Sequence, residues 1–311
     1  LKSQLSNIYK SIEAGSSLSE AFKKEKGIFT DMHINLIAAG EKSANLNEML
    51  QKIAEDLEKS KTLRGKISGA LIYPGIIFTV MIVVLFLMIT VMVPQVKELY
   101  TSLGQTELPG ITQFMVDVGN LLGSPVFLTF LVILLISVFV LYRYYASTPK
   151  GGREVDRFKL KIPIFGKIIN KYEVVQFCRL TSMLLQSGVQ IIESIKIVSN
   201  SSSNKIFKDI LVGSIEEVTK GIPFSAALAK LNEKEAFPAV LLKIMATGEE
   251  TGKLDQILED MGKMYEVELE ELTGNLTKVM EPFIMIVAGG MVGFLAIAIY
   301  LPIFQVGSIV S

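Results

Sequence analysis

A segment of the chain is repeated at an offset of 208 residues, and each copy joins a polar helical pattern to a long apolar run. The motif GEKSANL begins at Gly40, and the related motif GEETGKL begins at Gly248. Six pairs of identical residues share this offset: Phe29 and Phe237, Ala38 and Ala246, Leu50 and Leu258, Glu58 and Glu266, Pro74 and Pro282, Pro94 and Pro302. A long repeat in one register predicts two homologous modules with the same fold.

Three stretches of the chain contain no charged residue and are long enough to cross a membrane. They comprise residues 67–96, 118–142 and 282–311. Because about 20 consecutive apolar residues span the hydrocarbon core of a bilayer as a helix, the sequence predicts three transmembrane helices. We place them at 70–96, 121–142 and 281–303. The first and the third occupy equivalent places in the two copies.

The polar parts of the chain have the pattern of amphipathic helices. Beyond Asn45, apolar residues recur at spacings of three and four: Leu46, Met49, Leu50, Ile53 and Leu57. Segments with the alternation typical of strands are few. We therefore expect an all-α fold with two homologous helical-bundle modules and three transmembrane helices. The parts outside the spans are then a module at 1–66, an external loop at 97–120, a module at 143–280 and an external tail at 304–311.

The distribution of basic residues predicts which side of the membrane each part occupies. Basic residues cluster before the first span and after the second: Lys59, Lys61, Arg64, Lys66, Arg143, Lys150, Arg153 and Arg157. The stretch from Pro94 to Pro125, which we interpret as a loop, contains a single basic residue, Lys97. Since basic residues favour the cytoplasmic side, both modules are predicted to be cytoplasmic and the C-terminus external.

The first module is predicted to be incomplete at its N-terminal side. With a gap of two residues, Gly15 aligns with Gly221, and Leu1 then aligns with Phe207. The second copy has a further helical region before that point, at about 171–199, which nothing in the first copy matches. We expect the natural protein to carry additional residues before Leu1.

The motif at Gly248 has a superficial likeness to a phosphate-binding loop. It contains too few residues between its glycines, and Leu254 stands where a magnesium-binding Ser or Thr is required. We instead interpret Gly248 as a helix end, followed by a turn and a new helix from about Lys253, and Gly40 as the helix end in the first copy. Glu249 and Glu41 would then lie near a helix N-terminus, which favours acidic side chains.

Other chemistry has little support in the sequence. Glu249, Glu250 and Asp255 form a weak candidate set for a divalent cation, with capping and surface charge as the alternative. No catalytic set and no cofactor motif is found. The formal net charge of zero gives no sign of nucleic-acid binding. We interpret the single cysteine, Cys178, as a small buried apolar residue.

The spans contain two features of interest. Pro74 and Pro282 lie at the entrances of the first and third spans, where proline either bends a helix or is tolerated in its first turn. Gly289 and Gly293 are four residues apart, a spacing that permits close contact between helices. That contact is either packing within the chain, which we favour, or contact with a second copy in a homodimer.

The ordered set of features resembles one family, the type II secretion F-protein family. The resemblance is carried by the segments AAGEKSANLNEML and ATGEETGKLDQIL, by the turns at Gly15–Ser19 and Gly221–Ser225, and by three spans in this order. The motif positions are Gly40, Glu41, Leu46, Gly248, Glu249, Gly252 and Leu254. The first copy departs from the pattern at Ala44, which stands in place of Gly252.

The resemblance implies a non-enzymatic platform in the bacterial inner membrane. Such proteins serve type II secretion or type IV pilus assembly machines. They are thought to bind a cytoplasmic ATPase and to pass its motion to the transmembrane helices of pilins or pseudopilins, beside other inner-membrane assembly proteins. A membrane transport or channel component is the alternative, although the spans lack the buried ionisable groups that such proteins usually need. The sequence does not separate secretion from pilus assembly.

Overall fold

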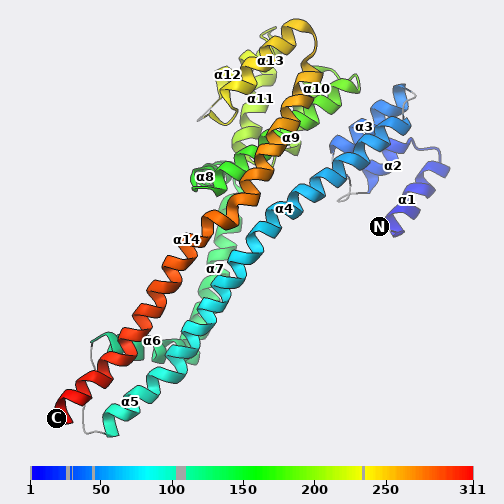
Figure 1. Cartoon of the computed structure of the whole chain (residues 1–311). Helices are drawn as coiled ribbons and strands as arrows, with labels where there is room; N and C mark the ends of the chain where they lie inside the picture. Colours follow the sequence, from blue (N-terminus) through cyan, green and yellow to red (C-terminus); the bar gives the residue numbers. More distant parts are fainter. Residues whose placement is uncertain are drawn as a thin grey trace. The chain divides into compact units, whose positions relative to one another are not determined.

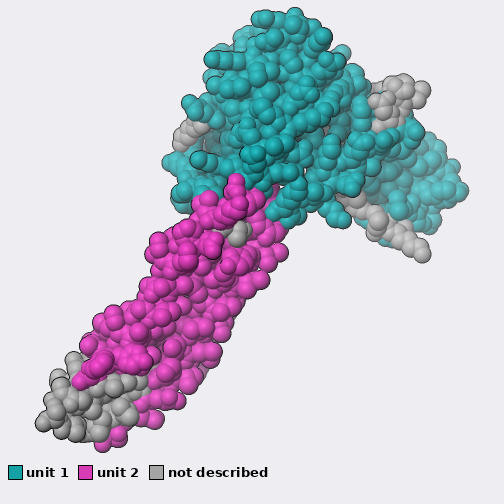
Figure 2. All heavy atoms as spheres, viewed as in Figure 1, with its two compact units in different colours: residues 1–66, 146–273 teal, residues 67–145, 274–311 magenta. Residues whose placement is uncertain are grey.

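The computed structural model describes residues 2–25, 29, 31–43, 46–102, 110–232 and 235–310. Within these ranges the regular secondary structure is entirely helical (Figure 1), and the predicted all-α fold is confirmed. The chain divides into two compact units, shown in Figure 2. The first unit comprises 1–66 and 146–273, and the second comprises 67–145 and 274–311.

The first unit contains both polar modules. The second module begins with α8 and continues through the N-terminal part of α14. Its helices are α8 (Pro149–Lys161), α9 (Phe165–Gln186), α10 (Ile191–Ser201), α11 (Lys205–Thr219), α12 (Phe224–Leu231), α13 (Ala239–Thr251) and α14 (Leu254–Val310). Its core is built around three buried aromatic rings. The Phe237 ring lies 4.9 Å from the Phe177 ring and 5.0 Å from the Phe207 ring, in edge-on arrangements that favour aromatic pairs.

The first module repeats the second half of this pattern. It consists of α1 (Lys2–Glu13), α2 (Leu18–Lys24), α3 (Asp31–Ser43) and the N-terminal part of α4 (Leu46–Leu87). Both bounds of α3 and α13 differ by the repeat offset, and so do the first residues of α4 and α14. The internal repeat read from the sequence is therefore present in the helices themselves.

One predicted boundary is wrong in both copies. Gly40 and Gly248 do not end their helices, because α3 continues to Ser43 and α13 continues to Thr251. The turn after α13 is made by Gly252 instead, which has a φ of 68°. A glycine adopts this left-handed conformation without the steric cost that a Cβ brings. The equivalent residue, Ala44, lies outside the described residues.

The second unit contains the apolar parts of three helices that are long and apolar enough to cross a membrane. They belong to α4, to α7 (Pro125–Ser147) and to α14. Helices α4 and α14 pass Pro74 and Pro282 without interruption. The second span begins at Pro125, a few residues later than predicted, because Ser124 separates it from a preceding helix.

The stretch that we interpreted as a loop is largely helical where it is described. It contains α5 (Val93–Ser102) and α6 (Gly110–Gly123). A short π-helix, η1 (Met88–Met92), joins α4 to α5. Pro94 gives a physical reason for it, since proline has no N–H and its ring clashes with the carbonyl four residues earlier in an α-helix. A local widening of the helix accommodates both effects.

Candidate sites in the repeated motif, between the modules and in the spans

The glutamate of the repeated motif caps a helix that begins 25 residues before it. Oε1 of Glu249 accepts a hydrogen bond from the backbone N–H of Phe224, with N and O 2.5 Å apart. Its Oε2 accepts one from the N–H of Ser225 at 2.8 Å and a short one from the Ser225 hydroxyl. These donors lie in the first turn of α12, where backbone N–H groups have no partner within the helix. The carboxylate therefore supplies the acceptors that α12 lacks.

Glu41 makes the same set of contacts in the first copy. Its Oε1 accepts from the N–H of Leu18 at 2.5 Å, and its Oε2 accepts from the N–H and the hydroxyl of Ser19 at 3.3 and 2.6 Å. The hydrogen bond from the Ser19 hydroxyl is the largest cause of a lowered pKa for the Glu41 carboxyl, because it favours the ionised form. The α2 turn and the α3 motif thus form one structural unit, as α12 and α13 do.

The two copies differ in one respect that bears on stability. In α2, the Ser17 hydroxyl also accepts a hydrogen bond from the N–H of Glu20, as part of a capping box. The equivalent position at the start of α12 is Pro223, which has no side-chain hydrogen bond to offer. Helix α12 therefore depends on Glu249 more than α2 depends on Glu41.

This capping corrects part of the sequence interpretation. The motif glutamates do bind a helix N-terminus, but it belongs to the preceding α2 or α12 and not to the helix that follows the motif.

Among the described residues, no group of three or more His, Cys, Asp or Glu side chains is placed to hold a metal ion. Of the weak cation candidates, Glu249 is engaged in capping and Glu250 is exposed, while Asp255 lies in the first turn of α14.

The motif glycines are sites of close approach between helices. A Cβ on Gly248 would lie 3.0 Å from Cδ1 of Ile257 and 3.1 Å from Cα of Leu254. A Cβ on Gly40 would lie 2.8 Å from Cγ of Met49 and 3.1 Å from Cα of Leu46. The two pairs of neighbours are equivalent in the repeat, so the glycine lets α3 or α13 cross the first turn of the next helix.

A buried ionic cluster joins the two modules within the first unit. Arg179 on α9 places Nε 2.9 Å from Oδ1 of Asp56 on α4, and both side chains are largely buried. The Arg179 guanidinium also donates to the Ser60 hydroxyl at 2.7 Å. Nε2 of His33 lies 3.8 Å from the other oxygen of Asp56. Because a buried charge requires a partner, this cluster links α4 to α9.

Sequence reasoning missed this cluster. Asp56 follows Ile53 by three residues and so lies on the buried stripe of α4, where an acidic residue is unusual. That position was the available signal. Beside the cluster is a cavity of about 580 Å³. Polar and charged side chains make up most of its lining, and they include His33, Asp56, Ser60, Arg64, Tyr172 and Gln176.

Cys178 has no role in these sites. Its side chain is fully buried on α9, as the sequence interpretation expected. Burial raises the pKa of the Cys178 thiol, because the thiolate is poorly solvated there. A protonated, inaccessible thiol is a packing residue and not a nucleophile.

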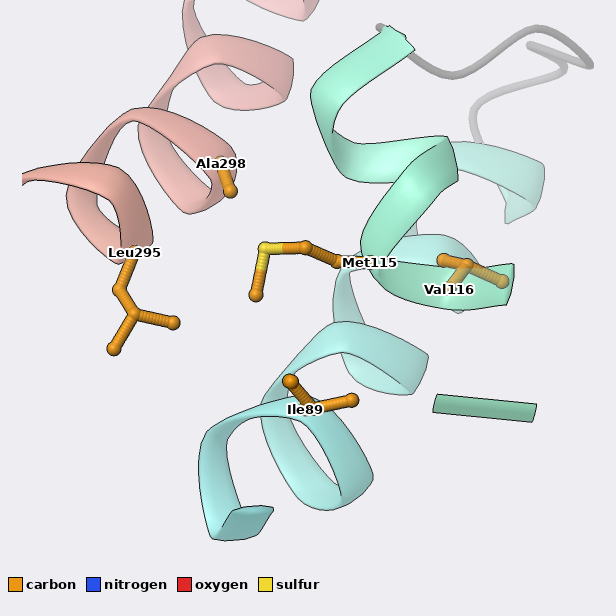
Figure 3. Close-up of a cluster of buried hydrophobic side chains, with 5 residues drawn as sticks. All are labelled: Ile89, Met115, Val116, Leu295 and Ala298. Carbon is orange, nitrogen blue, oxygen red and sulfur yellow. The ribbon is translucent and has the colours of Figure 1, made fainter. Parts of the chain in front are cut away.

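In the second unit, α6 packs against η1 and α14. Met115 and Val116 of α6 form a buried apolar cluster with Ile89, Leu295 and Ala298. Figure 3 shows Met115 pointing toward Leu295 and Ala298 of α14. By contrast, a Cβ on Gly289 or Gly293 would meet no atom within 4 Å. Packing within the chain, the interpretation that we favoured for these glycines, is therefore not found among the described residues.

Comparison with known proteins identifies the family. The family model described as type II secretion system protein F matches residues 1–94 and 177–302. The chain belongs to the type II secretion system protein F family. The two matched segments end at Pro94 and Pro302, which are equivalent in the repeat, so each contains the repeated part of the module and its membrane helix.

Similar proteins include members with two kinds of name. The type IV pilus assembly protein PilC of Thermus thermophilus is 36% identical over 302 residues, which cover 97% of this chain and 73% of that protein. PilC of Pseudomonas aeruginosa is 31% identical, with 100% and 82% covered. The type II secretion system protein F of Aeromonas hydrophila is 28% identical, with 100% and 79% covered. The resemblance read from the sequence motifs is confirmed.

All the motif residues that the sequence analysis named lie inside the two segments that the family model matches. They are Gly40, Glu41, Leu46, Pro74, Gly248, Glu249, Gly252, Leu254, Pro282, Gly289 and Gly293. In the structure the polar-module members build a helix cap and a helix crossing. The motif therefore specifies the module fold. Helix α6 lies outside both matched segments, in the part of the chain between them.

Proposed function

We propose that this protein is the inner-membrane platform of a type IV pilus assembly or type II secretion machine. Its cytoplasmic modules would bind the machine's ATPase, and its membrane helices would contact pilin or pseudopilin transmembrane helices and other assembly proteins. The observation that carries the proposal is the continuity of α4 and α14, each of which contributes residues to both units without a break. A continuous helix transmits displacement better than a flexible linker does.

The contacts between the modules also suit such a role. They include ionic and polar pairs: Asp56 with Arg179, Lys66 with Glu270 at 2.5 Å, and Arg64 with the Tyr172 hydroxyl at 3.3 Å. Polar interfaces with a cavity permit small relative movements more readily than closely packed apolar ones do. We infer that the first module shifts against the second when the ATPase acts.

Binding of the ATPase can be tested with purified components. The full chain in lipid nanodiscs is mixed with the purified cytoplasmic ATPase of the pilus or secretion machine from the same organism, and complex formation is followed by size-exclusion chromatography and by the rate of ATP hydrolysis. Co-elution and a changed hydrolysis rate are expected, with empty nanodiscs as the control. A second experiment deletes residues 146–270 in cells and measures pilus or pseudopilus assembly. The proposal is refuted if the purified chain neither co-elutes with the ATPase nor alters its hydrolysis rate, and if the deletion leaves assembly intact.

We further propose that the protein has no catalytic activity of its own and that both modules face the cytoplasm. The purified chain should hydrolyse no ATP above the rate of a protein-free control. An alkaline phosphatase fused after Ser311 should be active, since that enzyme requires an external location, whereas a fusion after Lys66 should be inactive. The reverse pattern would overturn the orientation. Nothing in the comparisons favours the alternative of a transport or channel component.

A homodimer stays a prediction. The open space beside Gly289 and Gly293 leaves room for a second helix. The combined change of Gly289→Ile and Gly293→Ile should reduce the particle mass in mild detergent if a second copy contacts this face. An unchanged mass would remove the dimer interpretation.

A further inference from the structure

We propose that α6 lies in the plane of the membrane surface and that its outer face binds lipid. The helix would lie at the membrane boundary that follows the first span and precedes the second, which the charge distribution predicts to be the non-cytoplasmic one. The proposal rests on three faces of α6 that carry three different kinds of side chain. Successive residues of a helix are about 100° apart, and each set occupies its own sector.

The first face of α6 packs on protein. It contains Thr112, Met115, Val116 and Gly119, of which the first three are at most 5% exposed. The Thr112 hydroxyl donates to the backbone carbonyl of Ala298 on α14, with the oxygens 2.8 Å apart. A Cβ on Gly119 would lie 3.2 Å from the carbonyl oxygen of Ile89 in η1. This face therefore attaches α6 to the first and third spans.

The second face of α6 is apolar and exposed. It contains Ile111, Phe114 and Leu121, which are 36%, 60% and 49% exposed, and Val118 lies between this face and the protein, where it packs against the buried cluster. The third face is polar and contains Gln113, Asp117 and Asn120, all exposed. The Gln113 amide donates to Oδ1 of Asp117 at 2.9 Å. The apolar and polar faces lie on either side of the face that packs on protein.

This arrangement matches a helix at the boundary between lipid and water. An interfacial helix buries its apolar face in the headgroup region and keeps its polar face hydrated. The level of α6 agrees, since Leu121 precedes Pro125, the first residue of the second span, by four positions. Val126 and Phe130, near the start of that span, are also apolar and exposed.

Two other placements of α6 fit less well. The helix has 14 residues, and at 1.5 Å per residue it is about 21 Å long, which is too short to cross a hydrocarbon core of about 30 Å. A crossing would also place Asp117 among lipid tails. If α6 lay entirely in water, Phe114 and Leu121 would be hydrated at a point where lipid is adjacent. A location in the surface plane satisfies all three faces.

The absence of tryptophan from the sequence allows a direct test. Phe114→Trp places a single fluorophore on the apolar face, and Asn120→Trp places a matched control on the polar face. Each variant is reconstituted into vesicles of phosphatidylcholine and phosphatidylglycerol. Emission is quenched either by brominated phosphatidylcholine or by iodide present on both sides of the bilayer. Leu121→Trp is a second apolar-face probe if Phe114→Trp does not fold.

The expected result is opposite quenching of the two faces. A side chain about 5–10 Å below the headgroups should be quenched about twofold or more strongly by brominated lipid than the control, with the reverse order for iodide. Equal iodide quenching of both faces would overturn the proposal and would leave a partner protein as the occupant of the apolar face. Equal lipid quenching of both would place α6 inside the bilayer. Neither ATPase nor pilin is present, so failure would not affect the proposed platform function.

Discussion

The cap that Glu249 provides to α12 makes a sharp prediction for the second module. Glu249→Ala removes the acceptor of two backbone N–H groups and one hydroxyl, while Pro223 offers no replacement. A hydrogen bond to a charged group contributes about 1.5–3 kcal/mol, and loss of an ordinary helix cap costs about 0.5–2 kcal/mol. Since the site is partly buried and water can replace some bonds, we expect the module to lose about 2–4 kcal/mol.

The measurement is native-state hydrogen exchange on the full chain in detergent, read at the amides of Phe224 and Ser225, together with thermal unfolding. Both amides should exchange faster in Glu249→Ala, because their acceptor is gone. The matched control is Glu250→Ala, which changes the neighbouring exposed acidic side chain. It should leave both amides protected. Glu249→Gln retains one acceptor and should have an intermediate effect.

A comparison between the copies tests the reasoning further. Glu41→Ala should destabilise its module less than Glu249→Ala destabilises the second, because the Ser17 hydroxyl remains as a cap for α2. Equal exchange of the Phe224 amide in Glu249→Ala and Glu250→Ala would refute the capping argument. A larger loss from Glu41→Ala would refute the distinction between the two copies.

Three further predictions follow from the same geometry. The pKa of the Glu41 carboxyl lies below its ordinary value of 4.5, chiefly because of the Ser19 hydroxyl, so the stabilisation that Glu41 gives to α2 is complete above pH 4.5 and is lost as the pH falls through the lowered pKa; the protection factor of the Ser19 amide, which is its exchange rate corrected for the intrinsic effect of pH, should fall in that acid range and stay constant between pH 6 and 8. Asp56→Asn leaves Arg179 buried without its ion-pair partner and should lower the stability of the first unit by about 3–5 kcal/mol in thermal unfolding, whereas exposed Glu58→Gln should have little effect. Gly248→Ala places a Cβ 3.0 Å from the Ile257 side chain and 3.1 Å from a backbone atom; a cost of about 1–3 kcal/mol is expected in the same assay, and a stable variant would contradict the close-approach role.

The platform proposal and the α6 proposal concern different parts of the chain. The first depends on the modules and on the unbroken helices α4 and α14. The second depends on α6, which lies between the two segments that the family model matches, so relatives need not share its sequence. Separate tests of the two parts therefore give independent answers.

The sequence alone determined the helical class, the three membrane spans, the duplication and the family. Each of these is encoded locally or by direct repetition: an apolar run of sufficient length must insert as a helix, and identical residues at one offset imply one fold twice. The predicted helix ends at Gly40 and Gly248 were wrong. Gly40 and Gly248 looked like ends because glycine disfavours helices, but their close contact with the next helix outweighs that local preference.

Only the tertiary structure decided which residues act together. The motif glutamates meet donors 22 to 25 residues earlier, Asp56 meets Arg179 from the other module, and one face of α6 packs against η1 and α14. Local periodicity reports which face of a helix is apolar, but it does not say what that face touches. Contacts between distant segments are set by how the helices pack, and they give the same residue types different roles at different places in the fold.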